Sequence, residues 1–132
     1  MVLSLRLYER IFSKETKHWQ QKIIGIIKLE DKIKEFTFGR NEQTKELIYN
    51  INKYTFIAAE QGRFRQLSNG RSYLYTPLPS KPSFLKINFS LFGFRWDRKE
   101  TMITDPTAIT VGDKIIYKGD DKEFIIEIVR IY

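Results

Sequence analysis

Short apolar runs separated by turn residues recur along the whole chain, and no segment keeps the period of a helix. Residues 2–8 alternate, with leucines at positions 3, 5 and 7 on one face, which is the period of a strand, although so short a stretch also suits the start of a helix. The polar residues 13–22 follow, where Ser13 and Thr16 favour a turn or a single helical turn. Residues 21–29 predict a buried strand. Residues 36–38 predict a second strand, which forms a hairpin with the first.

The rest of the chain continues the same pattern. Further strands are predicted at residues 46–51, 53–59, 71–76, 84–94 and 101–104. Asn69-Gly70 is a strong turn signal. Counting these runs predicts an all-β domain, a small barrel or sandwich of about seven to nine antiparallel strands with long loops. The whole of residues 1–132 is one domain, in which residues 1–22 are a candidate N-terminal arm and residues 77–104 a candidate extended loop or hairpin insertion.

Residues 105–132 predict a closing hairpin. The apolar run Ile115 to Tyr117 ends at Lys118-Gly119-Asp120-Asp121, and a second run starts at Phe124. We expect Gly119 to supply the positive φ of the turn, and Gly112-Asp113 to make a similar break before the first run.

Composition supports a folded domain of this class. The apolar fraction is 42%, which argues against disorder, and the ten Phe and seven Tyr suit a pleated surface. The chain has no cysteine, which excludes disulfides, thiolate metal sites and a cysteine nucleophile, and which fits a reducing compartment. No apolar run approaches the ~20 residues of a membrane span, and residues 1–12 lack the features of a signal peptide. We therefore expect no membrane contact and a cytoplasmic location unless the protein enters a larger particle.

The net charge of +7 is concentrated towards the N-terminal half of the chain. Such a balance favours a polyanion or an acidic protein surface as partner, and solubility alone is the plainer explanation. No block of five like charges forms a dedicated basic tail.

Candidate catalytic residues are scarce. His18 is the only histidine, and it is expected to be a surface residue beside Trp19. Four acidic residues crowd the closing hairpin, and turn chemistry explains them better than a cation site: Asp113, Asp120, Asp121 and Glu123. The glycines match no phosphate-binding motif. We predict no catalytic residue, no metal site and no cofactor, and an unrecognised hydrolase or nuclease is the weakest alternative.

Basic and aromatic residues alternate in two places. In Arg63-Phe64-Arg65, strand geometry places both arginines on one face and Phe64 on the other, which favours an exposed basic face over base stacking. Trp96, which lies among charged residues, is a candidate interface anchor or a core residue. The candidate DNA- or partner-facing residues are Arg63, Arg65, Arg71, Arg95 and Trp96, with Tyr73 as a further aromatic close to Arg71.

A first family resemblance covers residues 53–132. Its matching positions are Ile57, Ala59 and Gln61; Leu67 to Arg71; Tyr75 and Thr76; then Gly112, Asp113, Ile115, Tyr117, Gly119, Phe124 and Ile126. This pattern resembles the small head–tail connector proteins of tailed phages. The resemblance implies a structural subunit that forms a ring in the virion with portal or tail proteins. It also implies basic loop residues that face DNA or acidic partners, and sheet edges that pair by strand addition. Residues 77–104 depart from the compact pattern of that group.

A second resemblance uses other positions. Glu35 to Arg40 and the hairpin Val111 to Ile126 resemble segments of forkhead-associated phosphopeptide-binding domains. The Asn-Gly-Thr turn of that family is replaced here by Asn69-Gly70-Arg71, which is a departure from its pattern. The family's binding serine and histidine are missing, since residues 41–45 offer only Thr44. From the sequence we therefore expect a non-enzymatic assembly protein, a phage connector that assembles in the host cytoplasm and resides in the virion. The alternative is a binding module, either a degenerate forkhead-associated domain or a nucleic-acid-binding β-barrel.

Overall fold

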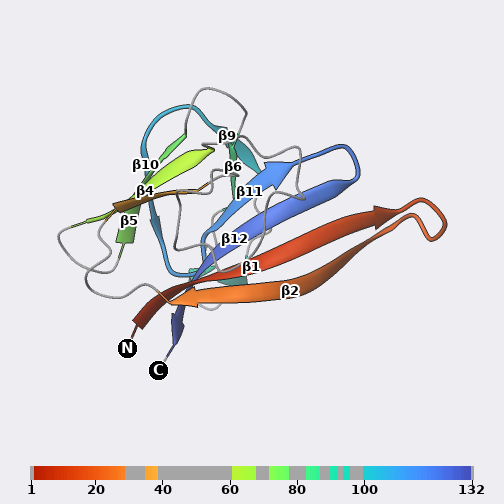
Figure 1. The fold of residues 1–132 in the computed structure, drawn as a ribbon, viewed down its shortest axis with the longest axis horizontal. Helices are drawn as coiled ribbons and strands as arrows, with labels where there is room; N and C mark the ends of the chain where they lie inside the picture. Colours follow the sequence, from red (N-terminus) through yellow and green to blue (C-terminus); the bar gives the residue numbers. More distant parts are fainter. Residues whose placement is uncertain are drawn as a thin grey trace.

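The protein is an all-β sandwich in which two antiparallel sheets face each other without closing into a barrel (Figure 1). The computed structural model describes residues 2–28, 35–38, 61–67, 72–77, 83–86, 90–91, 94–95 and 100–131. No helix occurs in these ranges. The predicted fold class is therefore confirmed, in its sandwich form.

The larger sheet has six strands in the order β2-β1-β12-β11-β6-β9. Their bounds are Val2–Ser13 for β1, His18–Lys28 for β2, Ser83–Lys86 for β6, Thr101–Ile103 for β9, Lys114–Lys118 for β11 and Lys122–Ile131 for β12. The first and last strands of the chain are neighbours, paired from Val2 with Ile131 to Ile11 with Lys122. This long pairing places β2 at one edge of the sheet.

The smaller sheet has the order β10-β5-β4-β3. Its strands are β3 Glu35–Phe38, β4 Gly62–Gln66, β5 Ser72–Pro77 and β10 Thr107–Thr110. The short strands β7 Ser90–Leu91 and β8 Phe94–Arg95 form a separate pair.

The core fills the space between the two sheets. Alternate residues of each strand point inward, as a pleated strand with one buried face requires. The buried apolar cluster contains Leu5, Leu7, Ile27, Phe64, Tyr73, Tyr75, Ile103, Ile109, Ile115, Tyr117, Phe124, Ile126 and Ile128. A smaller cluster of Tyr8, Ile116 and Ile125, with Phe84 packed against it, lies on the opposite face of the larger sheet.

Three buried hydroxyl groups form hydrogen bonds with one another in the core. The Tyr75 hydroxyl lies 2.7 Å from Ser83 Oγ and 3.0 Å from the Tyr117 hydroxyl, so these buried polar atoms satisfy one another. Burial raises the pKa of Tyr75 to about 12, and it also raises the pKa of Tyr117. Gly62 lies against the Tyr75 ring so closely that a Cβ there would collide with the ring and its hydroxyl. The position therefore requires glycine.

The turns before and within the closing hairpin differ from expectation at one residue. Gly112 has a positive φ of 94°, and the Asp113 carboxylate accepts a hydrogen bond of 2.9 Å from the Thr110 N–H, so turn chemistry explains Asp113 as predicted. The prediction for Gly119 is wrong, because Gly112 is the only described glycine with a positive φ. Gly119 directly follows β11, and its N–H donates to the Lys122 carbonyl at 2.8 Å, while Asp120-Asp121 makes the bend.

Two predictions for residues 21–38 are wrong. The strand predicted at 21–29 exists as β2, but it pairs with β1 and not with β3, which lies in the other sheet. It is also mostly exposed. A register shift opposite Leu7 and Tyr8 skips Ile24, so Ile23 and Ile26 fall on the outer face while Ile27 falls on the inner one. The apolar run is therefore divided between two faces at a sheet edge, and a single buried strand was the wrong interpretation.

Both candidate appendages contain strands of the larger sheet. Residues 2–13 and 18–22 belong to the paired strands β1 and β2. Within residues 77–104, β6 and β9 pair with each other and extend the larger sheet beside β11. The described residues contain twelve strands, more than the seven to nine predicted, because several are only two to four residues long. The predicted strands at 46–51 and 53–59 lie outside the described residues.

Candidate docking site on the β1–β2 hairpin

The closed end of the β1–β2 hairpin projects beyond the turn between β11 and β12 (Figure 1). The last residue pair of β1 with β12 is Ile11 with Lys122, followed by one hydrogen bond from the Phe12 N–H to the Asp121 carbonyl at 2.8 Å. Beyond this point β1 has a partner only in β2 among the described strands. The sequence closes the tip with a turn that starts at Ser13, whose carbonyl accepts the Lys17 N–H at 2.8 Å and whose Oγ accepts the Thr16 N–H. The predicted turn is confirmed.

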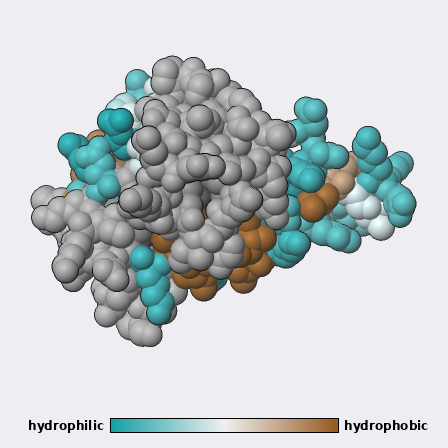
Figure 2. Space-filling view, in the orientation of Figure 1, coloured by the Kyte–Doolittle hydropathy of each residue, from teal (hydrophilic) through white to brown (hydrophobic). Residues whose placement is uncertain are grey.

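Apolar side chains line one face of this hairpin. The register places Phe12 opposite Trp19, and Tyr8 opposite Ile23. Trp19 is 40% exposed, Ile23 57% and Ile26 38%. We call Phe12, Trp19, Ile23 and Ile26 the hairpin stripe. Figure 2 shows apolar surface on the projecting part of the molecule, surrounded by polar surface.

Trp19 is held in place by two neighbours. Its ring lies 5.4 Å from the Phe12 ring at an interplanar angle of 54°, and the Arg10 guanidinium lies 4.9 Å from its centroid. Arg10 also forms an ion pair of 3.1 Å with Glu123, whose side chain is only 8% exposed. The Trp19 ring is therefore exposed and yet ordered, the combination found in interface anchors.

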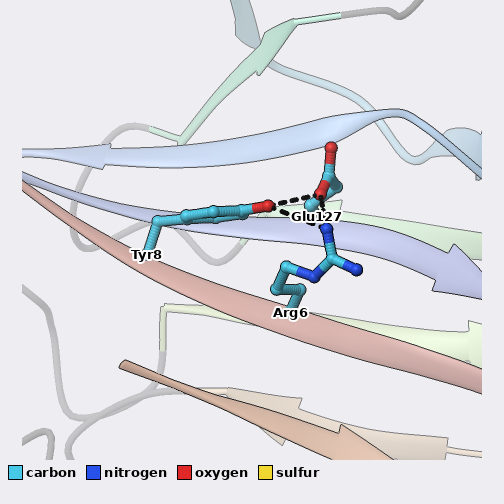
Figure 3. A network of polar contacts seen from close by, with 3 residues as sticks. All are labelled: Arg6, Tyr8 and Glu127. Atoms are coloured by element: carbon cyan, nitrogen blue, oxygen red, sulfur yellow. Dashed lines mark hydrogen bonds and ion pairs between the residues drawn. The ribbon is translucent and has the colours of Figure 1, made fainter. Parts of the chain in front are cut away.

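A polar network fixes the base of the hairpin to β12 (Figure 3). The Tyr8 hydroxyl donates to Glu127 at 2.8 Å and accepts from Arg6 at 3.2 Å, and Arg6 lies 3.6 Å from the same carboxylate. The hydrogen bond to Tyr8 raises the pKa of Arg6, and burial raises the pKa of Tyr8. Both groups therefore keep their protons at neutral pH. This arrangement ties β1 to β12 and stabilises the sheet.

Of the residues predicted to face DNA or a partner, the structure describes the side chains of Arg63 and Arg65, and both lie away from the hairpin. Arg63 and Arg65 are exposed on β4 of the smaller sheet, with Phe64 fully buried between them, as strand geometry predicted. Arg63 lies 3.5 Å from Glu35, an exposed ion pair that reduces the charge of this face. Tyr73 is buried and is not available for stacking. The backbone of Arg95 belongs to β8, while Arg71 and Trp96 lie outside the described residues.

The acidic residues of the closing hairpin do not form one site. Asp113 lies at the start of β11 while Asp120 and Asp121 follow its end, and Glu123 binds Arg10. His18 is exposed at the start of β2. In the described ranges no three His, Cys, Asp or Glu side chains are grouped to hold a metal ion.

The sequence does not predict the hairpin stripe, because the apolar run at residues 21–29 favours a buried strand. One signal was available. Trp19 stands in the polar segment 13–22, where an aromatic residue has no apolar neighbours along the chain to pack with. Comparison with known proteins adds nothing to this signal, since no protein-family model and no curated protein matches the chain. None of the described residues forms a helix long and apolar enough to cross a membrane.

Proposed function

We propose that this protein is a non-enzymatic structural protein that assembles with other protein chains, and that the β1–β2 hairpin is its docking element. One observation carries the proposal: an ordered Trp19 and an exposed Ile23 lie on a projecting hairpin at the edge of the larger sheet. Exposed apolar side chains on an edge strand favour aggregation unless a partner covers them. A partner chain is therefore the simplest reason for their presence.

The particular role we propose is that of a head–tail connector subunit of a tailed phage. Several copies would form a ring in the virion, with portal or tail subunits as neighbours and basic residues available for non-specific contact with DNA. The resemblance of residues 53–132 to that group supports this role. The exposed hairpin supports it as well, because a ring subunit needs surfaces that bind neighbouring chains.

Native mass spectrometry and sedimentation velocity test this role. The wild-type protein is expected to form closed oligomers larger than a dimer, alone or with a portal or tail protein. A Trp19→Ser/Ile23→Ser variant is expected to keep its circular dichroism spectrum and lose its association with the portal or tail protein. The matched control is Arg65→Ser, an exposed change on the other sheet, which should assemble as the wild type does. A wild-type protein that stays monomeric with every such partner contradicts the role.

A forkhead-associated-like binding module is the second candidate, and the open sandwich favours it over a nucleic-acid-binding barrel. The segment Glu35 to Arg40, which resembles a strand end of forkhead-associated domains, contains β3. This strand pairs with β4, which carries Arg63 and Arg65. Binding of phosphothreonine peptides by a monomer, weakened by Arg65→Glu and absent for the unphosphorylated peptides, would support this candidate. Salt-dependent binding of single-stranded DNA without phosphopeptide binding would instead support the nucleic-acid alternative.

A further inference from the structure

Among the described strands, the outer edge of β2 has no neighbour. Within the described part of the chain β2 pairs only with β1, and every residue from His18 to Ile23 is exposed. A strand edge that carries unpaired backbone N–H and C=O groups can hydrogen-bond to an added strand. The register shift near Ile24 bends the ladder, so the regular part of this edge is His18–Ile23.

The two faces of this edge differ in chemistry. Trp19 and Ile23 lie on the outer face, in register with Phe12 and Tyr8. Lys22 lies on the other face, where its ammonium is 3.4 Å from Glu9 and its side chain is 69% exposed. A strand added here would meet apolar groups on one of its faces and a positive charge on the other.

The charge of the hairpin identifies the partner. Residues 9–28 contain five Lys and Arg against two Glu. Lys14, Lys17 and Lys28 are exposed and form no ion pair with a described residue. Pairing two β2 edges from two copies would bring these like charges together, which opposes self-association at this edge. Negative side chains on the incoming strand would be attracted instead.

We propose that the His18–Ile23 edge binds an extended segment of a different protein chain, in which apolar residues alternate with Asp or Glu, as an added strand of the larger sheet. The apolar side chains of that segment lie on Trp19 and Ile23, and its carboxylates face Lys22 and the neighbouring lysines. The inference rests on the proposed function, because it names the chemistry of the partner that the hairpin docks.

A synthetic nonapeptide tests the inference, with valine or isoleucine alternating with glutamate or aspartate. Isothermal titration calorimetry with the full-length protein is expected to show binding that weakens as salt is added. Replacing the acidic residues of the peptide by lysine should weaken binding by about tenfold or more. On the protein, Ile23→Lys should weaken binding similarly, while Arg65→Glu, a charge reversal on the other sheet, should change it by less than about twofold.

Backbone methylation of the peptide distinguishes strand addition from mere contact. In an antiparallel ladder, alternate residues of a strand direct their N–H groups to the same neighbour. Methylating one alternate set of peptide nitrogens should abolish binding, and methylating the other set should leave binding within about threefold.

The outcomes separate this inference from the proposed function. Equal loss with both methylated peptides, or equal binding of the acidic and lysine peptides, overturns the inference. So does a wild-type dimer that Ile23→Lys dissolves, which identifies a second copy as the occupant of this edge. A ring that forms normally while the acidic peptide fails to bind leaves the proposed function standing and removes the strand-addition inference alone.

Discussion

The base and the tip of the β1–β2 hairpin have the same antiparallel pairing, but different surroundings cover their side chains. At the base, Leu5 and Leu7 are fully buried against the core and Tyr8 is 8% exposed. On the edge strand β2, Trp19 at the tip is 40% exposed, and Ile23, which lies opposite Tyr8, is 57% exposed. β12 supports the base, and its pairing with β1 ends at Ile11. The comparison separates residues that determine the fold from residues that are available to a partner.

The largest expected effect comes from truncating the same side chain in the two environments. Ile115→Ala removes a fully buried side chain from the core and is expected to lower the free energy of unfolding by about 2–5 kcal/mol. Ile23→Ala removes the same atoms from the exposed face of the edge strand β2 and should change the free energy of unfolding by less than about 0.5 kcal/mol. Urea unfolding followed by circular dichroism measures both. Comparable losses would show that Ile23 belongs to the cooperative core, and the distinction between buried and exposed positions of the hairpin would fail.

The second prediction concerns the buried hydroxyls of the core. The pKa of Tyr75 in the folded protein is about 12, above its ordinary value of 10.0, so the folded state binds this proton more tightly than the unfolded state. The contribution of this proton to the free energy of unfolding is fully present below pH 10 and is lost as the pH rises towards 12. The shift corresponds to a loss of about 3 kcal/mol from Tyr75 alone. Tyr117 shifts in the same direction.

Unfolding measured from pH 8 to 12 checks this alkaline loss. Tyr75→Phe should lower stability at neutral pH by about 1 kcal/mol through its lost hydrogen bonds, and it should also reduce the slope above pH 10. Ile23→Ala, on the exposed face of β2, should keep the alkaline midpoint of the wild type. An unchanged slope in Tyr75→Phe would assign the alkaline loss to other groups.

The sequence predicted strands with neighbours on both sides better than it predicted the edge strand β2. The closing hairpin and the alternation of Arg63-Phe64-Arg65 are confirmed, because a strand with one buried face has a period of two that needs no knowledge of its neighbours. The position of β2 depends on such knowledge. The apolar residues at 23–27 suit a buried strand or an edge strand equally, and only the long-range pairing of β1 with β12 places β2 at the edge. For this reason the exposure of Ile23 and Ile26 could not be predicted, and Trp19 in the polar segment 13–22 was the one available signal of the hairpin stripe.

The third prediction compares two ion pairs. Arg10, where the tip joins the base, is 3.1 Å from a Glu123 side chain that is 8% exposed, whereas both partners of Arg63–Glu35 are about half exposed. Arg10→Ala leaves a buried carboxylate without this partner and uncovers Trp19, so it should cost about 1–3 kcal/mol. Arg63→Ala should cost less than about 0.5 kcal/mol. Thermal unfolding at low and high salt measures both losses of stability. Equal losses in the two variants would show that the ion pair of Arg10 with Glu123 does not anchor the tip.

The smallest expected effect lies in the turn at the end of the tip. Lys17 has a φ of 59°, in the left-handed region that a lysine side chain disfavours and that asparagine enters more readily. Lys17→Asn should therefore raise the free energy of unfolding, by up to about 1 kcal/mol. Lys14→Asn is the matched control, because it makes the same change in the same turn at a residue without a positive φ, and it should give no gain.

The Lys17 result also shows how tightly the tip is coupled to the base. If the tip folds cooperatively with the sandwich, Lys17→Asn relieves the backbone strain at this position and raises the midpoint of global unfolding. If the tip opens locally, Lys17→Asn slows amide hydrogen exchange of residues 14–20 and leaves the global midpoint unchanged. An equal gain from Lys14→Asn would assign the effect to the charge of the turn and not to its backbone. A tip that opens alone can still adjust to an incoming strand, whereas a cooperative tip presents a rigid edge and binds such a strand at a lower cost in conformational entropy.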